Sequence, residues 1–185
     1  RRTGLKAINL KGNDTLEWVE PSSKNDQVFL VTRNGQSIRF KGSNIRPMGR
    51  AAAGVRGIKL APKDEVIAMH IIPKDQITNG QILVITQNGY GKRTKLNQYR
   101  IQGRGGTGIK TAKITPKTGA VVNASIISKP DIKNTDVLII SEKGQVIRIS
   151  ADQISELGRS TQGVKVMNPT DASGQVATFT TWLEK

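Results

Sequence analysis

The chain has 185 residues and carries 29 Lys and Arg against 14 Asp and Glu, a formal net charge of +15 that favours an anionic polymer or surface as its partner. The absence of cysteine excludes disulfide frameworks and thiolate metal sites, and a single histidine excludes a histidine metal cluster. Two Trp, two Tyr and three Phe are too few for a platform that stacks single-stranded bases, and no apolar run has transmembrane length.

The first predicted element is a pair of strands joined by a tight turn. The run VFLVTRNG at 28–35 has the continuous apolar composition of a strand buried on both faces. Asn34-Gly35 predicts a two-residue hairpin turn, in which both central residues take positive φ. The following QSIRF at 36–40 alternates polar and apolar residues, which predicts a strand with one solvated face.

The same pattern returns twice along the chain, as ILVITQNG at 82–89 and VLIISEKG at 137–144. Two further markers keep the same phase, with a period of about 55 residues. One is a glycine, an apolar residue and a cation, which reads GLK at 4–6, GVR at 54–56, GIK at 108–110 and GVK at 163–165. The other is a Gly-Arg step at 49–50, 103–104 and 158–159.

This repeat predicts an all-β, propeller-like fold built from four-stranded blades of about 50–55 residues. No stretch shows a helical period with caps at both ends. One domain over 1–185 is expected, with units at 1–49, 50–103, 104–158 and 159–185. These are too few for an ordinary closed ring, so the chain is expected to be part of a larger ring. A sandwich or barrel of duplicated hairpins is the alternative.

Cations that recur at one phase of a repeat occupy equivalent places and therefore form rows. The candidate DNA-binding residues follow from this: Arg39, Arg93 and Arg148 after the turns; Lys6, Arg56, Lys110 and Lys165 in the glycine–cation marker; Arg50, Arg104 and Arg159 in the Gly-Arg step; and Lys92 beside Arg93. A duplex that follows such rows is recognised through its phosphate backbone and its deformability.

A structural interpretation competes with DNA contact, because an arginine at a fixed phase can also hydrogen-bond a neighbouring blade. For Arg50, Arg104 and Arg159 both interpretations remain open. For Arg39, Arg93 and Arg148 the alternating strand favours an outward, solvated side chain and DNA contact.

Three segments resemble the C-terminal domain of the gyrase A family. They are IRPMGRAAAGVRGIKL at 45–60, ILVITQNGYGKRTKLNQY at 82–99 and ISELGRSTQGVKVM at 154–167. The resemblance implies a β-pinwheel, a propeller-like ring whose blades exchange strands. It also implies that duplex DNA wraps around a basic rim, so that the bacterial type II topoisomerase introduces negative supercoils.

The resemblance further implies a cytoplasmic, nucleoid-associated protein whose partners are the gyrase A breakage-reunion region and gyrase B. The catalytic tyrosine lies in that breakage-reunion region, so the chain is not expected to be an enzyme on its own, and no cofactor is expected. The alternatives are the homologous domain of topoisomerase IV and a propeller that binds an acidic partner protein.

The segment QGRGGTG at 102–108 is similar to the gyrase A box, Gln-Arg-Arg-Gly-Gly-Lys-Gly, which the family needs for wrapping. Gly103 and Thr107 replace two of its cations. Because the neighbouring residues resemble a late blade, 102–108 is interpreted as a degenerate or late-blade copy, with the true box expected upstream of Arg1.

Other motifs fail on their context. The glycines at 103, 105 and 108 form a GxGxxG, but a β-rich segment follows where the dinucleotide motif requires a helix. GYGKRT at 89–94 resembles a phosphate loop, yet Thr86 and Arg93 stand where Gly and Ser or Thr are required. His70 is expected to be a half-buried strand residue, and Tyr90 to be structural or to contact a nucleic-acid backbone.

Overall fold

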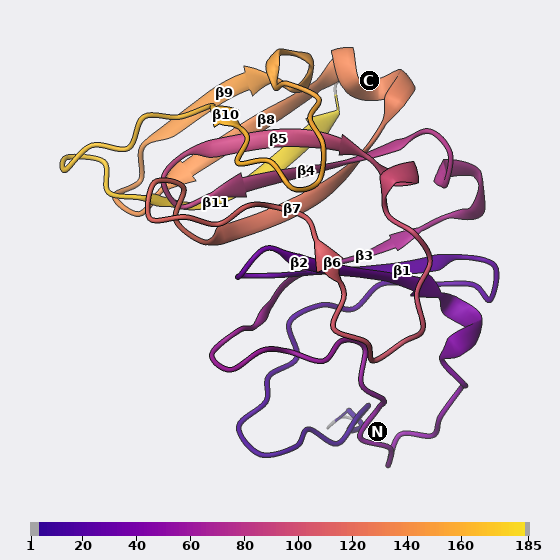
Figure 1. Cartoon of the computed structure of the whole chain (residues 1–185). Helices are drawn as coiled ribbons and strands as arrows, with labels where there is room; N and C mark the ends of the chain where they lie inside the picture. The colour runs from indigo at the N-terminus through magenta and orange to yellow at the C-terminus, as the bar shows by residue number, and fades with distance from the viewer. Residues whose placement is uncertain (1–3, 184–185) are drawn as a thin grey trace.

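Short apolar runs punctuated by glycine turns leave little room for helices, and the computed structural model is all-β (Figure 1). It describes residues 4–183, so residues 1–3 and 184–185 of the predicted first and last units lie outside the described residues. The strands are β1 (Gln27–Thr32), β2 (Gln36–Lys41), β3 (Val66–Ile72), β4 (Gly80–Thr86), β5 (Tyr90–Lys95), β6 (Ile109–Lys110), β7 (Val121–Ser128), β8 (Thr135–Ser141), β9 (Val146–Ser150), β10 (Val164–Lys165) and β11 (Val176–Leu183). The 3-10 turns are η1 (Gly42–Asn44), η2 (Lys74–Gln76), η3 (Leu96–Gln98), η4 (Lys129–Asn134) and η5 (Ala151–Gln153).

The strands form three antiparallel sheets that follow one another along the chain. The first sheet has the order β3-β1-β2-β6, the second β10-β5-β4-β7 and the third β11-β8-β9. In Figure 1 the first sheet lies below the other two. The predicted all-β, propeller-like architecture is confirmed, with four strands in the first two sheets and three among the described residues of the third.

The outermost strand of a sheet comes from the next repeat. Strand β6 follows the β4–β5 hairpin in sequence, yet it pairs with β2 of the first sheet, with Gln36 opposite Lys110. Strand β10 pairs with β5 in the same way, with Tyr90 opposite Lys165. The predicted limits at 49/50 and 103/104 therefore mark the repeat, whereas the first two sheets each take strands from three predicted units and the third sheet from two. A sequence period identifies equivalent residues, but pairing partners depend on the path of the long connections.

The two edges of each sheet face different surroundings. Strand β3 contacts β7 and β7 contacts β11, so the third strands of successive repeats lie side by side. Strands β6 and β10 form the opposite edges of their sheets, which we call the outer edge.

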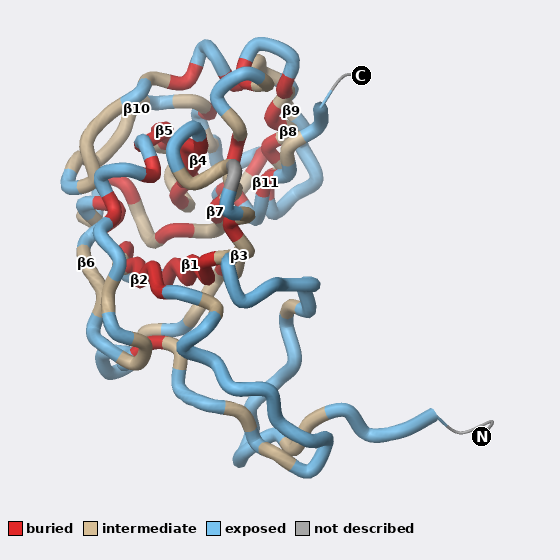
Figure 2. The backbone as a smooth tube through the Cα atoms, turned by 90° about the vertical axis from the view of Figure 1, so that its right-hand side faces the viewer, coloured by how far each residue is buried: buried red, intermediate tan, exposed pale blue. Residues whose placement is uncertain are grey.

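The core lies between stacked sheets, which Figure 2 shows as the buried strands in the middle of the chain. All residues of β1 and β4 are buried, as predicted from their continuous apolar runs. The four residues after the first residue of β2 and of β5 are buried too, so the predicted solvated face is wrong for these strands. The middle sheet, which contains β5, packs against a neighbouring sheet on each face. In β2, Ile38 and Phe40 pack with Ile58 of the connection that precedes β3. Only β9 keeps an exposed, alternating face among the described hairpin strands.

The hairpin turns differ from the predicted type. The Gly35 amide donates to the Thr32 carbonyl at 3.0 Å, and Gly35 has φ 76°. Asn34 has no positive φ, because Lys63 is the one non-glycine residue with positive φ in the described part of the chain. The turn is therefore a four-residue β-turn that ends on a left-handed glycine, which is the geometry of a three-residue hairpin loop.

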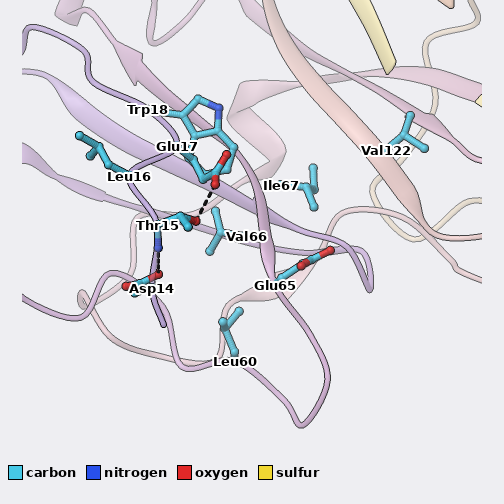
Figure 3. Close-up of a pocket in the computed structure, with 10 residues that line it drawn as sticks. All are labelled: Asp14, Thr15, Leu16, Glu17, Trp18, Leu60, Glu65, Val66, Ile67 and Val122. Atoms are coloured by element: carbon cyan, nitrogen blue, oxygen red, sulfur yellow. Dashed lines mark hydrogen bonds between the residues drawn. The ribbon is translucent and has the colours of Figure 1, made fainter. Parts of the chain in front are cut away.

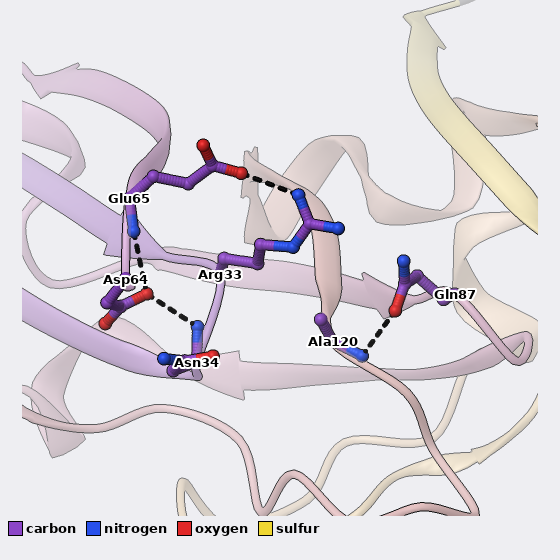
Figure 4. Close-up of polar contacts among 6 residues, drawn as sticks. All are labelled: Arg33, Asn34, Asp64, Glu65, Gln87 and Ala120. Atoms are coloured by element: carbon purple, nitrogen blue, oxygen red, sulfur yellow. Dashed lines mark hydrogen bonds and ion pairs between the residues drawn. The ribbon is translucent and has the colours of Figure 1, made fainter. Parts of the chain in front are cut away.

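Each of the first two turns is tied to the segment that precedes the third strand of its sheet (Figure 4). In the first, the Arg33 guanidinium donates to the Glu65 carboxylate at 2.7 Å, and the Asn34 amide donates to Asp64 at 2.9 Å. In the second, the Ala120 amide donates to the Gln87 side chain at 2.9 Å. These bonds hold the turn end of each hairpin against a neighbouring segment.

Candidate functional site

Two of the arginines that follow the turns are buried and join neighbouring sheets. Arg39 on β2 donates to the Gln27 side chain and to the carbonyls of Leu96 and Tyr99, the latter two at 2.7 and 3.0 Å. Those carbonyls belong to the η3 region of the second sheet. The exposed fraction of Arg39 is 4%, and burial lowers the pKa of its guanidinium.

Arg93 repeats this arrangement one unit later. It donates to the Gln81 side chain at 2.8 Å and to the carbonyls of Ile154 and Asp152, at 2.7 and 3.1 Å, in the η5 region of the third sheet. It is buried like Arg39, and desolvation lowers the pKa of its guanidinium as well.

Arg148 has the same phase but a different environment. It pairs with Asp136 on the adjacent strand, and 58% of its side chain is exposed. The expected outward side chain is thus wrong for Arg39 and Arg93 and correct for Arg148. One sequence signal could have indicated the bonding partner, though not the burial: a polar residue, Gln27, Gln81 or Asp136, precedes each arginine at a constant spacing on the paired strand.

The glycine–cation marker supplies the exposed cations of the outer edge. Lys110 lies on β6 and Lys165 on β10, the outermost strands of their sheets. Lys6 and Arg56 hold the equivalent places in the two earlier copies of the marker, lie outside strands and are exposed as well. We call these four residues, Lys6, Arg56, Lys110 and Lys165, the cation row.

The Gly-Arg arginines connect successive members of the cation row. Arg104 donates to the carbonyl of Arg56 at 2.7 Å, and Arg159 donates to the carbonyl of Lys110 at 2.9 Å. Both arginines are half-buried, whereas Arg50 is exposed. Hydrogen bonding to a neighbouring unit, which the sequence left open for this set of arginines, is therefore found for Arg104 and Arg159. These bonds keep the outer loops in contact.

Lys92 lies beneath one of these outer loops rather than on the surface. Its ammonium donates to the carbonyls of Gly158 and Arg159, both at 2.7 Å, and to the Thr161 hydroxyl at 3.1 Å. Its exposed fraction is 2%, so the expected DNA contact by this side chain is not supported by its position. The equivalent positions are Ile38 and Ile147, and this apolar phase is the signal that could have predicted an inward side chain.

The buried Lys92 ammonium predicts a rise in stability at alkaline pH. Burial and the nearby Arg159 lower its pKa from 10.5 to about 8. Between pH 8 and 10.5 the unfolded chain holds more protons than the folded chain, so this group makes folding more favourable as the pH rises. We expect the gain to be about 1–3 kcal/mol, measured as the free energy of unfolding relative to Lys92→Met.

Comparison with Lys92→Met also removes the effect of Tyr99, which is common to both proteins. Burial raises the pKa of Tyr99 to about 12, so its contribution to stability falls above pH 10. If the difference between the two proteins stays constant from pH 7 to 10.5, the Lys92 ammonium does not lose its proton in this range.

The remaining candidate residues form no recognisable catalytic arrangement. His70 is half-buried on β3, as predicted, and its Nε2 donates to the Ala124 carbonyl at 2.8 Å. Among the side chains that the structure describes, no three His, Cys, Asp or Glu are placed to hold a metal ion, and no helix in the described part of the chain is long and apolar enough to cross a membrane.

A cavity of about 620 Å³ lies between the N-terminal segment and β3 (Figure 3). The carboxylates of Asp14, Glu17 and Glu65 line it together with apolar side chains, among them Trp18. The structure thus brings carboxylates from two distant segments of the chain to one cavity. Their negative charge does not suit the anionic ligand that the exposed cations favour.

Known proteins that resemble the chain agree on one family. A family model described as DNA gyrase C-terminal domain, beta-propeller, matches most of the sequence. The matched segments are 1–23, 26–73, 80–128 and 135–179. The last three of these segments begin close to β1, β4 and β8, the strands that open the three hairpins.

Curated relatives are gyrase A proteins, each named as the A component of DNA gyrase. The chain is 40% identical to that of Lawsonia intracellularis over 94% of its length, and 38% identical to that of Mycolicibacterium smegmatis over 96%. It spans about a fifth of the length of each, since 20% of either relative is matched.

Two solved structures share the fold. The C-terminal domain of DNA topoisomerase IV superposes with a TM-score of 0.85, covering 96% of this chain and 53% of that one. The DNA gyrase A C-terminal domain gives 0.83, covering 98% and 59%. Sequence identity is 24% in both cases, so these similarities concern the fold alone.

Proposed function

The chain belongs to the DNA gyrase C-terminal domain family, and from this premise we propose that it binds duplex DNA along its outer edge and wraps it. The observation that carries the proposal is the cation row. Its four members are exposed and recur at one phase of the repeat, and two of them, Lys110 and Lys165, lie on the outermost strands of their sheets. Each can therefore meet the DNA phosphate backbone without rearrangement of the core.

Wrapping follows from the repeat of this geometry. We expect equivalent cations on successive sheets to lie along an arc, because β3 contacts β7 and β7 contacts β11, so that similar contacts relate each sheet to the next. A duplex that meets them in turn must bend. Bending a site of 20–30 base pairs by 40–90° costs on the order of 1–6 kcal/mol, so several contacts must form together.

We place this activity within a bacterial type II topoisomerase, in the cytoplasm on the nucleoid. The partners would be the gyrase A breakage-reunion region and gyrase B, and wrapping would direct the enzyme towards negative supercoiling. The chain itself would contribute DNA binding and no catalytic group or cofactor. In this role, contact with phosphates and shape would matter more than base sequence.

Salt dependence tests the proposal directly. If about six phosphates are neutralised, log K for a labelled duplex of random sequence should fall against log salt with a slope near −5. The measurement is a fluorescence titration at several salt concentrations.

Two further outcomes separate the alternatives. Binding of an acidic protein that duplex DNA does not displace would favour a protein-interaction propeller. An assay with relaxed circular plasmid and a nicking-closing topoisomerase distinguishes wrapping from simple binding. A wrapped complex leaves a change in linking number of one sign, and a complex that binds without wrapping leaves none.

A further inference from the structure

A tyrosine and two lysines gather at the turn end of the second sheet. Tyr90 is the first residue of β5 and is half-buried. The ammonium of Lys165 lies 4.6 Å from the centroid of its ring, and that of Lys117 lies 5.6 Å from it. We call Tyr90, Lys117 and Lys165 the Tyr90 cluster.

The backbone around the cluster is held tightly, so the positions of the lysines are not accidental. The Lys165 ammonium donates to the Asn88 carbonyl at 2.9 Å. The Asn88 side chain donates to the carbonyls of Pro116 and Lys117, both at 3.1 Å. A Cβ on Gly89 would lie 2.0 Å from the Met167 carbonyl, which shows how closely the 165–167 segment packs on the turn.

The chemistry of the cluster suits an anion. In the described part of the chain, neither lysine forms an ion pair with a carboxylate. The π face of the ring attracts both ammonium groups, although these groups repel each other. An anion beside the ring would relieve this repulsion and accept hydrogen bonds from both ammonium groups, and the Tyr90 hydroxyl could add a third.

The first sheet provides a comparison within the same chain. Its equivalent residues are Gln36 in place of Tyr90, with Lys63 and Lys110 in place of the two lysines. A cavity of about 360 Å³ lies beside Gln36 and is lined by the Asp64 side chain, whose carboxylate would repel a phosphate. The second sheet has Thr-Gly-Ala at 118–120 in this place. The pair of lysines thus recurs, but the aromatic ring and the absence of a carboxylate are particular to the second sheet.

We propose that the Tyr90 cluster is a preorganised binding site for one phosphodiester group of duplex DNA. This inference rests on the proposed function and adds a specific anchor to the row of exposed cations. The two lysines supply the positive charge, and the Tyr90 ring holds their ammonium groups in position. Loss of charge and loss of placement should therefore have different effects on binding.

The test compares variants of the whole chain in titrations of a labelled random duplex at several salt concentrations. Lys117→Gln with Lys165→Gln should make the slope of log K against log salt less steep by about 0.9, because both lysines bind the same phosphodiester group and each neutralised phosphate contributes about 0.9. Tyr90→Gln, which installs the side chain of the first sheet, should keep the slope and weaken binding about threefold to tenfold. Tyr90→Phe keeps the ring and should retain most of the affinity.

The matched control is Lys129→Gln with Lys133→Gln, two exposed lysines of η4 at the other end of the hairpins. The inference is wrong if the Lys117/Lys165 pair changes the slope no more than this control, or if Tyr90→Gln binds like the unmodified chain. In both cases the unmodified chain still binds DNA and the proposed function stands. A chain that does not bind duplex DNA at low salt overturns both. Should Tyr90→Gln not fold, Tyr90→Leu and the double lysine variant provide the same comparison.

Discussion

Replacing Arg93 by methionine is expected to lower the free energy of unfolding by about 3 kcal/mol, because it leaves buried acceptors without their donor. The guanidinium donates to one side chain on its own sheet and to two carbonyls of the next sheet. Methionine fills much of the same volume, so the loss reports hydrogen bonds rather than a cavity. Urea denaturation followed by circular dichroism measures the change.

Arg148→Met is the matched control for this prediction. Arg148 has the same phase and the same type of partner on the adjacent strand, yet more than half of its side chain is exposed. Its replacement is expected to change the free energy of unfolding by no more than about 1 kcal/mol, as is usual for exposed ion pairs. Equal losses for Arg93→Met and Arg148→Met would show that the contacts between sheets contribute little to stability.

Replacing the four members of the cation row by glutamine is expected to weaken duplex binding about a thousandfold at 0.15 M salt. Four lost phosphate contacts should also make the slope of log K against log salt less steep by about 3 to 4. The folded structure should persist, because all four side chains are exposed. Affinity for a labelled duplex and the linking number of a relaxed plasmid are the two measurements.

A second quadruple variant removes the same charge from a different place. Lys24, Lys74, Lys129 and Lys133 are exposed and lie at the ends of the hairpins opposite the turns. Their replacement by glutamine should reduce binding far less, since they lie away from the outer edge. If both quadruple variants lose the same affinity, net charge rather than the cation row determines binding, and a defined path for the DNA is excluded.

The local elements and the repeat were predictable from the sequence because they depend on neighbouring residues. Continuous Val, Leu and Ile runs that lead into a glycine turn determine the β1–β2 and β4–β5 hairpins, and their recurrence indicates a propeller-like fold. The prediction that Lys110 and Lys165 belong to a recurring row of cations came from their shared phase, and both side chains are exposed. The net charge alone indicated an anionic partner.

Strand exchange was not derivable from the residues, because β6 and β10 consist of two residues each and pair with a hairpin far back in the sequence. No local pattern in so short a segment specifies its partner. The resemblance to a known family, rather than composition or period, supplied the expectation that blades exchange strands.

The burial of the arginines was decided by tertiary structure. Arg39, Arg93 and Arg148 stand at one phase on strands of similar pattern, yet Arg39 and Arg93 are covered by the next sheet and Arg148 is largely exposed. Alternation along a strand determines which side chains share a face, and the stacking of sheets determines whether that face meets water. The sequence by itself therefore determined the hairpins, the period and the sign of the charge. Only the packing of one sheet on the next decided which cations hold the sheets together and which remain available to a phosphate backbone.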